Sequence, residues 1–176
     1  MILFLDFDGV LHPYFQSTDP SDPESQKLCF LGNFEKALRN TPQLEEIDIV
    51  ISSRWRLDRS LKDLQNLFSP DIAKKIIGKT PFLDDNDSED GARQKEVEAW
   101  LITENKTDQS WIGIDDNVYL YDRPTCVVFC MDGFREREML LLKEALQDPI
   151  LYAQKYPLPR GQENRVKPRV RIGGAL

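Results

Sequence analysis

Short apolar runs and longer helical patterns alternate along the chain. Four continuous apolar runs are typical of strands buried on both faces: Ile2–Leu5, Ile47–Ile51, Trp111–Ile114 and Cys126–Met131. The pair Ile76–Ile77 is a weaker candidate for a further strand. Apolar residues between the runs recur at helical spacing, in segments that end at or before Pro42, Pro70 and Pro149, because proline interrupts a helix.

The helical patterns fall into four segments. They are Asn33–Arg39, the stretch that carries Leu57, Leu61, Leu64 and Phe68, the stretch Arg93–Leu101, and a last helix through Met139, Leu142 and Leu146 that stops at Pro149. Strands that alternate with helices predict an α/β fold, with a central parallel sheet between two layers of helices.

Three segments lack either pattern. Pro13–Gln26, with three prolines among Ser, Thr and Asp, is predicted to be a loop, and Asp84–Asp90 holds five acids that we expect to be solvated. The end of the chain, from Arg160, carries five cations and one acid. We therefore divide the chain into one catalytic domain, 1–159, and a basic C-terminal tail, 160–176, for which a solvated tail is favoured over an arm that touches nucleic acid.

Polar side chains follow three of the apolar runs at the point where each run ends: Asp6, Ser52 and Asp115. Ligands and chemistry gather at the carboxyl ends of parallel strands, so these residues are expected to share one site. Asp6 and Asp8 form one pair of acids, with Gly9 allowing a sharp turn after them. Alone, this pair could be an acidic turn.

A second pair of acids, Asp115 and Asp116, follows another run in the same way. Asp-Asp-Asn also favours turns, but two such pairs in one alternating fold are an improbable coincidence. Hard carboxylate oxygens suit Mg²⁺, so Asp6, Asp8, Asp115 and Asp116 are the predicted metal ligands.

Ser52 and Ser53, followed by Arg54 and Arg56, offer a hydroxyl, backbone N–H groups and guanidinium groups to a phosphate. One serine could equally cap the helix that begins near Trp55.

A further cation is needed to offset the acids. Arg93 and Lys95, at the start of a predicted helix, are favoured over Lys79, although each could be an ordinary exposed cation.

These motifs resemble those of haloacid-dehalogenase (HAD) superfamily phosphohydrolases. Asp6-Phe-Asp-Gly-Val-Leu11 is similar to the first motif, Ile47–Ser52 to the second, and Asp115-Asp116 to the fourth. The degenerate third motif falls on Arg93 or Lys95. Ser-Ser-x-Trp-Arg and Glu96-Val-x-x-Trp-Leu101 resemble one branch, the HAD domain of Swiss Army Knife RNA repair proteins.

The resemblance implies a Rossmann-like fold and a set of roles. Asp6 would be the nucleophile and Asp8 the general acid and base, whose pKa should then lie above that of Asp6. The carbonyl of Asp8 and the carboxylate of Asp115 would bind Mg²⁺, with Asp116 in support. Ser52, or Ser53 in the neighbouring register, and Arg93, or Lys95, would bind the phosphoryl group.

The intervals between the motifs are too short for a full cap domain, so the resemblance implies a capless or minimally capped enzyme. His12, Tyr14 and Phe15 lie on the predicted loop. The two aromatics could stack on a base or sugar, or pack the loop against the body. His12 is a candidate for substrate binding, as are Arg54 and Arg56, but it is more often a hydrogen-bonding scaffold.

Composition, charge and the length of the apolar runs add four constraints. One histidine disfavours a multi-histidine zinc site, and three cysteines without paired spacing indicate a reduced, cytoplasmic protein. No apolar run is long enough to cross a membrane. The formal charge of −7 argues against passive coating of nucleic acid, but not against a local basic site.

The predicted function is a Mg²⁺-dependent phosphatase that acts through an aspartyl-phosphate on a phosphorylated small molecule or a nucleic-acid end. The alternatives are a nucleic-acid end phosphatase of RNA or DNA repair and a non-catalytic interaction module with the same fold.

Overall fold

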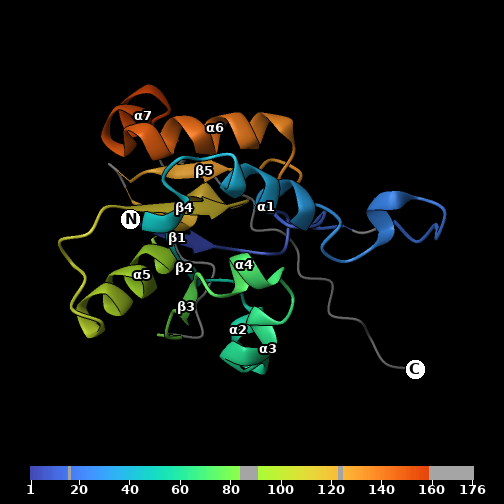
Figure 1. The fold of residues 1–176 in the computed structure, drawn as a ribbon, viewed down its shortest axis with the longest axis horizontal. Coiled ribbons are helices and arrows are strands. Elements are labelled where there is room, and N and C mark those ends of the chain that lie inside the picture. Colours follow the sequence, from blue (N-terminus) through green and yellow to red (C-terminus); the bar gives the residue numbers. More distant parts are fainter. Residues whose placement is uncertain (16, 84–90, 123–124, 159–176) are drawn as a thin grey trace, which may run out of the picture.

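The computed structural model describes residues 1–15, 17–83, 91–122 and 125–158. Five parallel strands form one sheet in the order β3-β2-β1-β4-β5 (Figure 1). The strands are β1 (Ile2–Leu5), β2 (Asp48–Ile51), β3 (Ile76–Lys79), β4 (Trp111–Asp115) and β5 (Val127–Phe129). The fold is therefore α/β, as the alternation of patterns predicts.

The register of the three central strands brings their carboxyl ends level. Ile2 pairs with Asp48 and Trp111, and Leu5 pairs with Ile51 and Ile114. Parallel strands in this register carry the residues that follow them to the same edge of the sheet. Asp6, Ser52 and Asp115 consequently share that edge.

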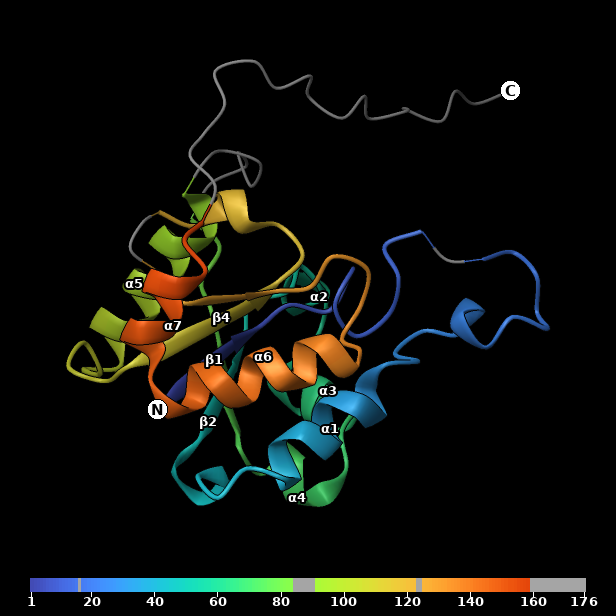
Figure 2. The same cartoon turned by 90° about the horizontal axis from the view of Figure 1, so that it is seen from above.

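Helices cover both faces of the sheet (Figures 1 and 2). The helices are α1 (Leu31–Arg39), α2 (Trp55–Asp58), α3 (Leu61–Gln65), α4 (Pro70–Ala73), α5 (Ala92–Thr103), α6 (Glu136–Gln147) and α7 (Pro149–Lys155), with short 3₁₀ turns η1 (Pro23–Ser25), η2 (Leu44–Glu46) and η3 (Val118–Leu120). Residues of α1, α3, α4 and α6 share one core cluster with alternate strand residues, and α5 packs on the opposite face. The three predicted layers are confirmed.

The strand residues alternate between these two cores, because successive side chains of a strand point to opposite faces. Leu3 and Leu5 lie in the larger cluster, whereas Ile2 and Phe4 lie in the smaller one. The Phe4 ring meets the edge of Trp100 on α5 at a centroid distance of 5.7 Å.

One helix prediction is wrong, and another is correct only in part. The periodic stretch from Leu57 to Phe68 is broken after Asp58, because Arg59 is extended and Ser60 begins a new helix with a capping box. The helix through Met139, Leu142 and Leu146 ends at Gln147, as a stop at Pro149 predicts, but it is not the last helix, because α7 begins at Pro149. Proline suits the first turn of α7, where Asp148 caps the exposed N–H groups.

Several expectations fall outside the described residues: the acidic segment Asp84–Asp90, the basic tail and the domain boundary at residue 159. In the described intervals after β1 and β2, only short helices and turns occur, and no cap domain is present. No helix among the described residues has the length and apolarity needed to cross a membrane.

The larger core cluster predicts where truncation destabilises the fold most. Phe34 of α1 is fully buried and packs edge-on against Phe134, with centroids 5.5 Å apart. We expect Phe34→Ala to lower the free energy of unfolding by about 3–5 kcal/mol in urea titrations, because it leaves a cavity. Leu140→Ala, at an exposed position of α6, should change it by less than about 0.5 kcal/mol.

Candidate active site

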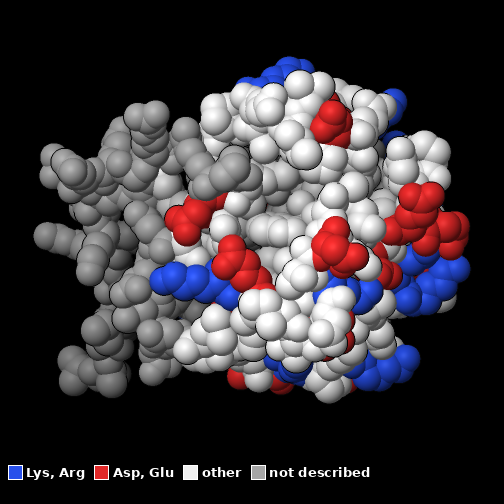
Figure 3. Space-filling view, turned by 90° about the vertical axis from the view of Figure 1, so that its left-hand side faces the viewer, with Lys and Arg blue, Asp and Glu red and all other residues white. Residues whose placement is uncertain are grey.

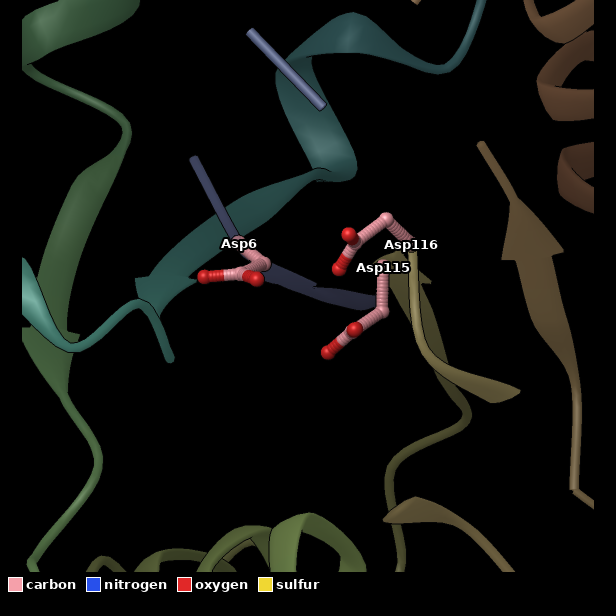
Figure 4. Close-up of side chains that lie close together, drawn as sticks. All are labelled: Asp6, Asp115 and Asp116. Atoms are coloured by element: carbon pink, nitrogen blue, oxygen red, sulfur yellow. The ribbon is translucent and has the colours of Figure 1, made fainter. Parts of the chain in front are cut away.

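Three carboxylates from two adjacent strands lie together at the carboxyl edge of the sheet. Asp6 follows β1, and Asp115 and Asp116 lie at the end of β4 (Figure 4). Each offers one oxygen, and these oxygens lie within 4.8 Å of one another. Asp6 is 7% exposed and Asp115 is completely buried, so water does not separate their charges.

Gly9 makes the close approach of Asp116 possible. Its φ of +72° lies in the left-handed region, and a Cβ at this position would stand 2.2 Å from Oδ2 of Asp116. The N–H groups of Val10 and Leu11 both donate to the carbonyl of Phe7, which closes the turn. The chain therefore folds back immediately after the first pair of acids.

Asp115 is held from both sides. Its Oδ1 accepts from the backbone N–H of Asn117 at 2.9 Å, and its Oδ2 accepts from the Tyr121 hydroxyl at 3.1 Å. These bonds fix the carboxylate with its oxygens toward Asp6 and Arg93.

Burial and like charge raise the pKa values of all three acids. Burial raises the pKa of Asp6, and Arg93 opposes this only in part. Burial raises the pKa of Asp115, and Asp6 adds to the rise. The same two causes raise the pKa of Asp116 to about 7. The described protein groups do not fully compensate this concentration of negative charge.

Arg93 of α5 is the cation that faces the acids. Its Nε lies 3.7 Å from Oδ2 of Asp115, and its side chain is buried. Burial by itself lowers the pKa of this guanidinium, but Asp6 and Asp115 outweigh it and raise the pKa. Lys95 is exposed two residues later.

Lys79, the less favoured candidate for the cation that offsets the acids, binds backbone carbonyls instead. Its Nζ donates to the carbonyls of Arg56 and Arg59 at 2.7 and 2.9 Å. Lys79 therefore caps the end of α2, where cations satisfy free carbonyls.

The two serines after β2 are both fully buried but have different partners. Ser53 donates a hydrogen bond to Asp6, whereas Oγ of Ser52 has no partner among the described residues. Nη1 of Arg93 is likewise buried without a partner. Nδ1 of His12 and Oγ1 of Thr80 lack a described partner too. Of these atoms, Nη1 of Arg93 belongs to the side chain that contacts Asp115, so an anion bound beside the acids would supply the partner that it lacks.

Asp8 points to a different neighbourhood from the other three acids. Its Oδ1 lies 3.0 Å from Nε2 of His12 and accepts from the Trp55 indole N–H at 3.2 Å. The hydrogen bond to His12, assisted by Trp55, lowers the pKa of Asp8 against the effect of burial. The sequence-based expectation that the pKa of Asp8 exceeds that of Asp6 is therefore wrong when only the surrounding protein residues act on the two acids.

The carboxylate of Asp8 is also absent from the cluster that could hold a metal. A contribution of Asp8 to the metal through its carboxylate is thus not supported, and the carbonyl remains the group that the resemblance assigns.

The two arginines after Ser53 differ in position. Arg54 is exposed, whereas Arg56 is buried and pairs with Glu96 of α5 at 2.5 Å. Arg56 also donates to the carbonyls of Ser52, Thr80 and Pro81. The expected role of Arg56 in substrate binding is not supported, because its guanidinium ties α2 to α5 inside the protein.

Three residues that touch the site have no role in the sequence-based prediction. Trp55 contacts Asp8, Tyr121 contacts Asp115, and Glu96 pairs with Arg56. Trp55 and Glu96 belong to the segments that carry the family resemblance, so a signal existed for them. Tyr121 follows Asp115 at a spacing that fits no motif.

The donor set fits a hard divalent cation. Three converging carboxylates with raised pKa values supply oxygen ligands and excess negative charge, which Mg²⁺ prefers. A cavity of about 620 Å³ lies away from these acids, where β4 and β5 begin, and its lining includes Trp111, Cys126 and Ile150 but no charged residue. Figure 3 views that side of the molecule, where acids and bases are interspersed among uncharged residues.

A comparison with known families agrees with this geometry. The family described as the HAD domain in Swiss Army Knife RNA repair proteins matches residues 2–136. The chain belongs to this family. The match contains every residue of the candidate site, from Asp6 to Tyr121, and it confirms the resemblance found in the motifs. No curated protein and no solved structure matches the chain.

Gly9 provides a direct test of how the HAD domain assembles its acids. We expect Gly9→Ala to lower the free energy of unfolding by at least about 2 kcal/mol, because it combines a left-handed backbone with a clash against Asp116. In Gly32→Ala, where a Cβ meets open space on α1, stability should stay level or rise by up to ~1 kcal/mol. Equal effects of the two variants in thermal unfolding would contradict the close approach.

The raised pKa values predict an unusual dependence of stability on pH. A carboxyl with a raised folded pKa ionises more easily in the unfolded chain, so stability is lost as pH rises from 3.8 through about 7. In chelator, Asp116→Asn should remove part of this loss and stabilise the protein at pH 8 by roughly 1–4 kcal/mol.

The measurement is urea unfolding at a series of pH values, with and without Mg²⁺. Added Mg²⁺ should stabilise the wild-type protein at pH 8 more than it stabilises Asp116→Asn. Asp108→Asn, at an exposed acid beyond α5, is the matched control and should follow the wild type. A variant less stable than wild type in chelator would overturn the assignment of repulsion to Asp116.

Proposed function

We propose that this HAD domain is a Mg²⁺-dependent phosphohydrolase that cleaves a phosphate monoester through an aspartyl-phosphate on Asp6. The observation that carries the proposal is the convergence of Asp6, Asp115 and Asp116 beside Arg93 and Ser53. These groups supply a nucleophile, metal ligands and phosphate donors in one place.

Asp6 is the only member of the acidic cluster that also contacts a hydroxyl at the end of β2. Ser53 donates to it, and Arg93 stabilises its charge. A carboxylate oxygen of Asp6 would attack phosphorus while the ester P–O bond breaks. Arg93 and Ser52, or Ser53 as the alternative, would bind the phosphoryl oxygens, and the backbone N–H groups that follow Ser52 would add further donors.

Asp8 would give its proton to the departing oxygen and then take one from water. The activated water attacks phosphorus, releases inorganic phosphate and restores Asp6. His12 and Trp55 both bond to Oδ1 of Asp8, which fixes the carboxyl group for this transfer. An incoming phosphate dianion raises the pKa of a nearby carboxyl group and so opposes the lowering by His12.

Asp6, Asp115 and the carbonyl of Asp8 would hold Mg²⁺, with Asp116 beside them. When bound, this cation offsets the charge of the acids and of the phosphate, which otherwise repel each other.

Two other functions were considered. The family description names RNA repair, which favours the end of a nucleic-acid strand as the substrate. A non-catalytic interaction module would keep the fold without needing a free nucleophile. The hydrogen-bonding of Asp8 by both His12 and Trp55 favours an enzyme, since it orients a partly exposed carboxyl group beside the acidic cluster.

Asp6→Asn tests the nucleophile. With p-nitrophenyl phosphate and Mg²⁺, we expect this variant to lower kcat by at least about 1000-fold, because an amide cannot form the acyl-phosphate. The wild-type protein should gain a phosphate that mass spectrometry detects after acid quenching, and the variant should not. Asp108→Asn should retain full activity. Wild-type turnover by Asp6→Asn would contradict the assignment, and a wild-type protein without any metal-dependent turnover would favour the interaction module.

A further inference from the structure

The side of the site where solvent reaches the general acid carries features that the phosphoryl chemistry does not use. The Asp8 side chain is 38% exposed, whereas Asp6 and Asp115 are buried. Under the proposed function, Asp8 protonates the leaving oxygen, so the leaving group must lie on this open side. The residues that surround Asp8 there are therefore the first that a leaving group meets.

Trp55 is the central residue of this open side. Its indole N–H donates to Asp8, and its ring packs edge-on against Phe7 with centroids 5.4 Å apart. The His12 ring lies 5.7 Å away on the same tryptophan. Trp55 is thus fixed next to the general acid and only half-buried.

Two cations lie against the Trp55 ring. The Arg59 guanidinium lies 4.4 Å from the ring centroid, and Nζ of Lys27 lies 5.4 Å from it. Both side chains belong to exposed residues, and neither forms an ion pair with a carboxylate in the part of the chain that the structure describes. Lys27 is also close enough to Asp8 to lower its pKa.

The two cations come from different segments of the chain, and each segment is anchored to the body of the protein. Arg59 is the extended residue between α2 and α3, and its carbonyl accepts a hydrogen bond from Lys79 at 2.9 Å. Lys27 precedes α1, in a segment whose Glu24 accepts two short hydrogen bonds from Arg135, the residue before α6. Arg59 lowers the pKa of Asp63, as Lys27 does that of Asp8, but neither cation lies within ion-pair distance of a described carboxylate. Two such cations on one aromatic ring can attract a further anion.

We propose that Lys27 and Arg59, supported by Trp55, form a leaving-group subsite that binds a second phosphate next to the scissile one. This inference rests on the proposed function, because it takes Asp8 as the marker of the leaving group. A terminal phosphate on a nucleic-acid strand supplies such a leaving group, with a phosphodiester one nucleotide away. The planar Arg59 guanidinium also offers a surface on which a base can stack.

A second groove near the site fits the leaving group less well. A cavity of about 470 Å³ lies between Asp116 and α7, with Arg137 and Lys155 in its lining. Arg137 already pairs with Glu138, and Lys155 with Glu144. This groove borders the metal-ligand side of the site and not the general acid, so it serves as the comparison in the test.

The test compares substrates that differ in their second phosphate. They are adenosine 5′- and 3′-monophosphate, adenosine 3′,5′-bisphosphate, adenylyl dinucleotides with a terminal 5′- or 3′-phosphate, and p-nitrophenyl phosphate. We expect the wild-type protein to show at least a tenfold higher kcat/KM for one dinucleotide than for the matching monophosphate. In the double variant Lys27→Ala/Arg59→Ala this preference should fall at least tenfold, mainly through KM.

The control variants separate the subsite from general charge effects. Arg137→Ala removes a cation from the second groove and should keep the preference for the dinucleotide. If Arg137→Ala abolishes the preference and the double variant keeps it, the strand lies in the other groove and the proposal is wrong. A preference for the bisphosphate without a preference for the dinucleotide would show that the second phosphate comes from a small bisphosphate. That result would overturn the assignment of a nucleic-acid strand end as the leaving group.

A binding measurement keeps the subsite testable apart from catalysis. Calorimetry with Asp6→Asn protein should show at least tenfold weaker binding of the terminally phosphorylated dinucleotide when Lys27 and Arg59 are also replaced by alanine. The affinity of Asp6→Asn protein for this dinucleotide should fall as the salt concentration is raised. The fall should be smaller when Lys27 and Arg59 are also replaced by alanine. Absence of p-nitrophenyl phosphate turnover with this binding intact would refute the phosphatase but leave the subsite standing. Equal binding by both proteins would refute the subsite.

Discussion

The repulsion among buried carboxylates is the constraint on which the site of this HAD domain depends. Asp6, Asp115 and Asp116 have oxygens within 4.8 Å of one another, in a part of the protein from which water is largely excluded. A fold tolerates such a cluster only if opposite charge lies close by. Arg93 provides one fixed positive charge, and the raised pKa values show that it does not offset all three acids. The negative charge that Arg93 leaves uncompensated is the physical reason why the cluster suits a divalent cation.

The scaffold around the acids is built to hold this arrangement against its own repulsion. The sheet register places Asp6 and Asp115 level, and Gly9 leaves room for Asp116 where any side chain would collide with it. The Tyr121 hydroxyl donates a hydrogen bond to Asp115. The buried pair of Arg56 and Glu96 joins the segment after β2 to α5, so that Ser53 and Arg93 keep their places on either side of Asp6. Removing either Arg56 or Glu96 would leave the other charge buried without a partner, which destabilises a folded protein. The pair therefore has a structural role.

The sequence predicts the parts of this arrangement that depend on the order of elements along the chain. Each apolar run marks a strand, and parallel strands bring Asp6, Ser52 and Asp115 to one edge whatever the details of packing. The contacts between side chains from different segments were not predictable in this way. The hydrogen bond from Trp55 to Asp8 joins residues 47 positions apart, and no periodicity along the chain indicates it. Arg59 is extended at a position where the periodicity from Leu57 to Phe68 favours a continuous helix. The lowered pKa of Asp8 follows from His12, whose return to Asp8 depends on the turn at Gly9.

The two acids of the first motif therefore occupy opposite electrostatic surroundings although one residue separates them. Asp6 lies on the buried side with the acidic cluster, which raises its pKa, and Asp8 lies on the open side with His12, Trp55 and Lys27, which lower its pKa. Under the proposed function, a phosphate between them would meet Arg93 and the serines after β2 on one side. On the other side it would meet Lys27 and Arg59, which form no ion pair with a described carboxylate. The open side thus has the charge to receive a further anion, and the buried side the charge to receive a metal. Under the proposed function, this division favours a leaving group near Arg59 over one near Asp116, since Asp8 is reached by solvent and Arg59 lies on the neighbouring Trp55 ring, whereas Arg137 and Lys155 beside Asp116 are paired with glutamates.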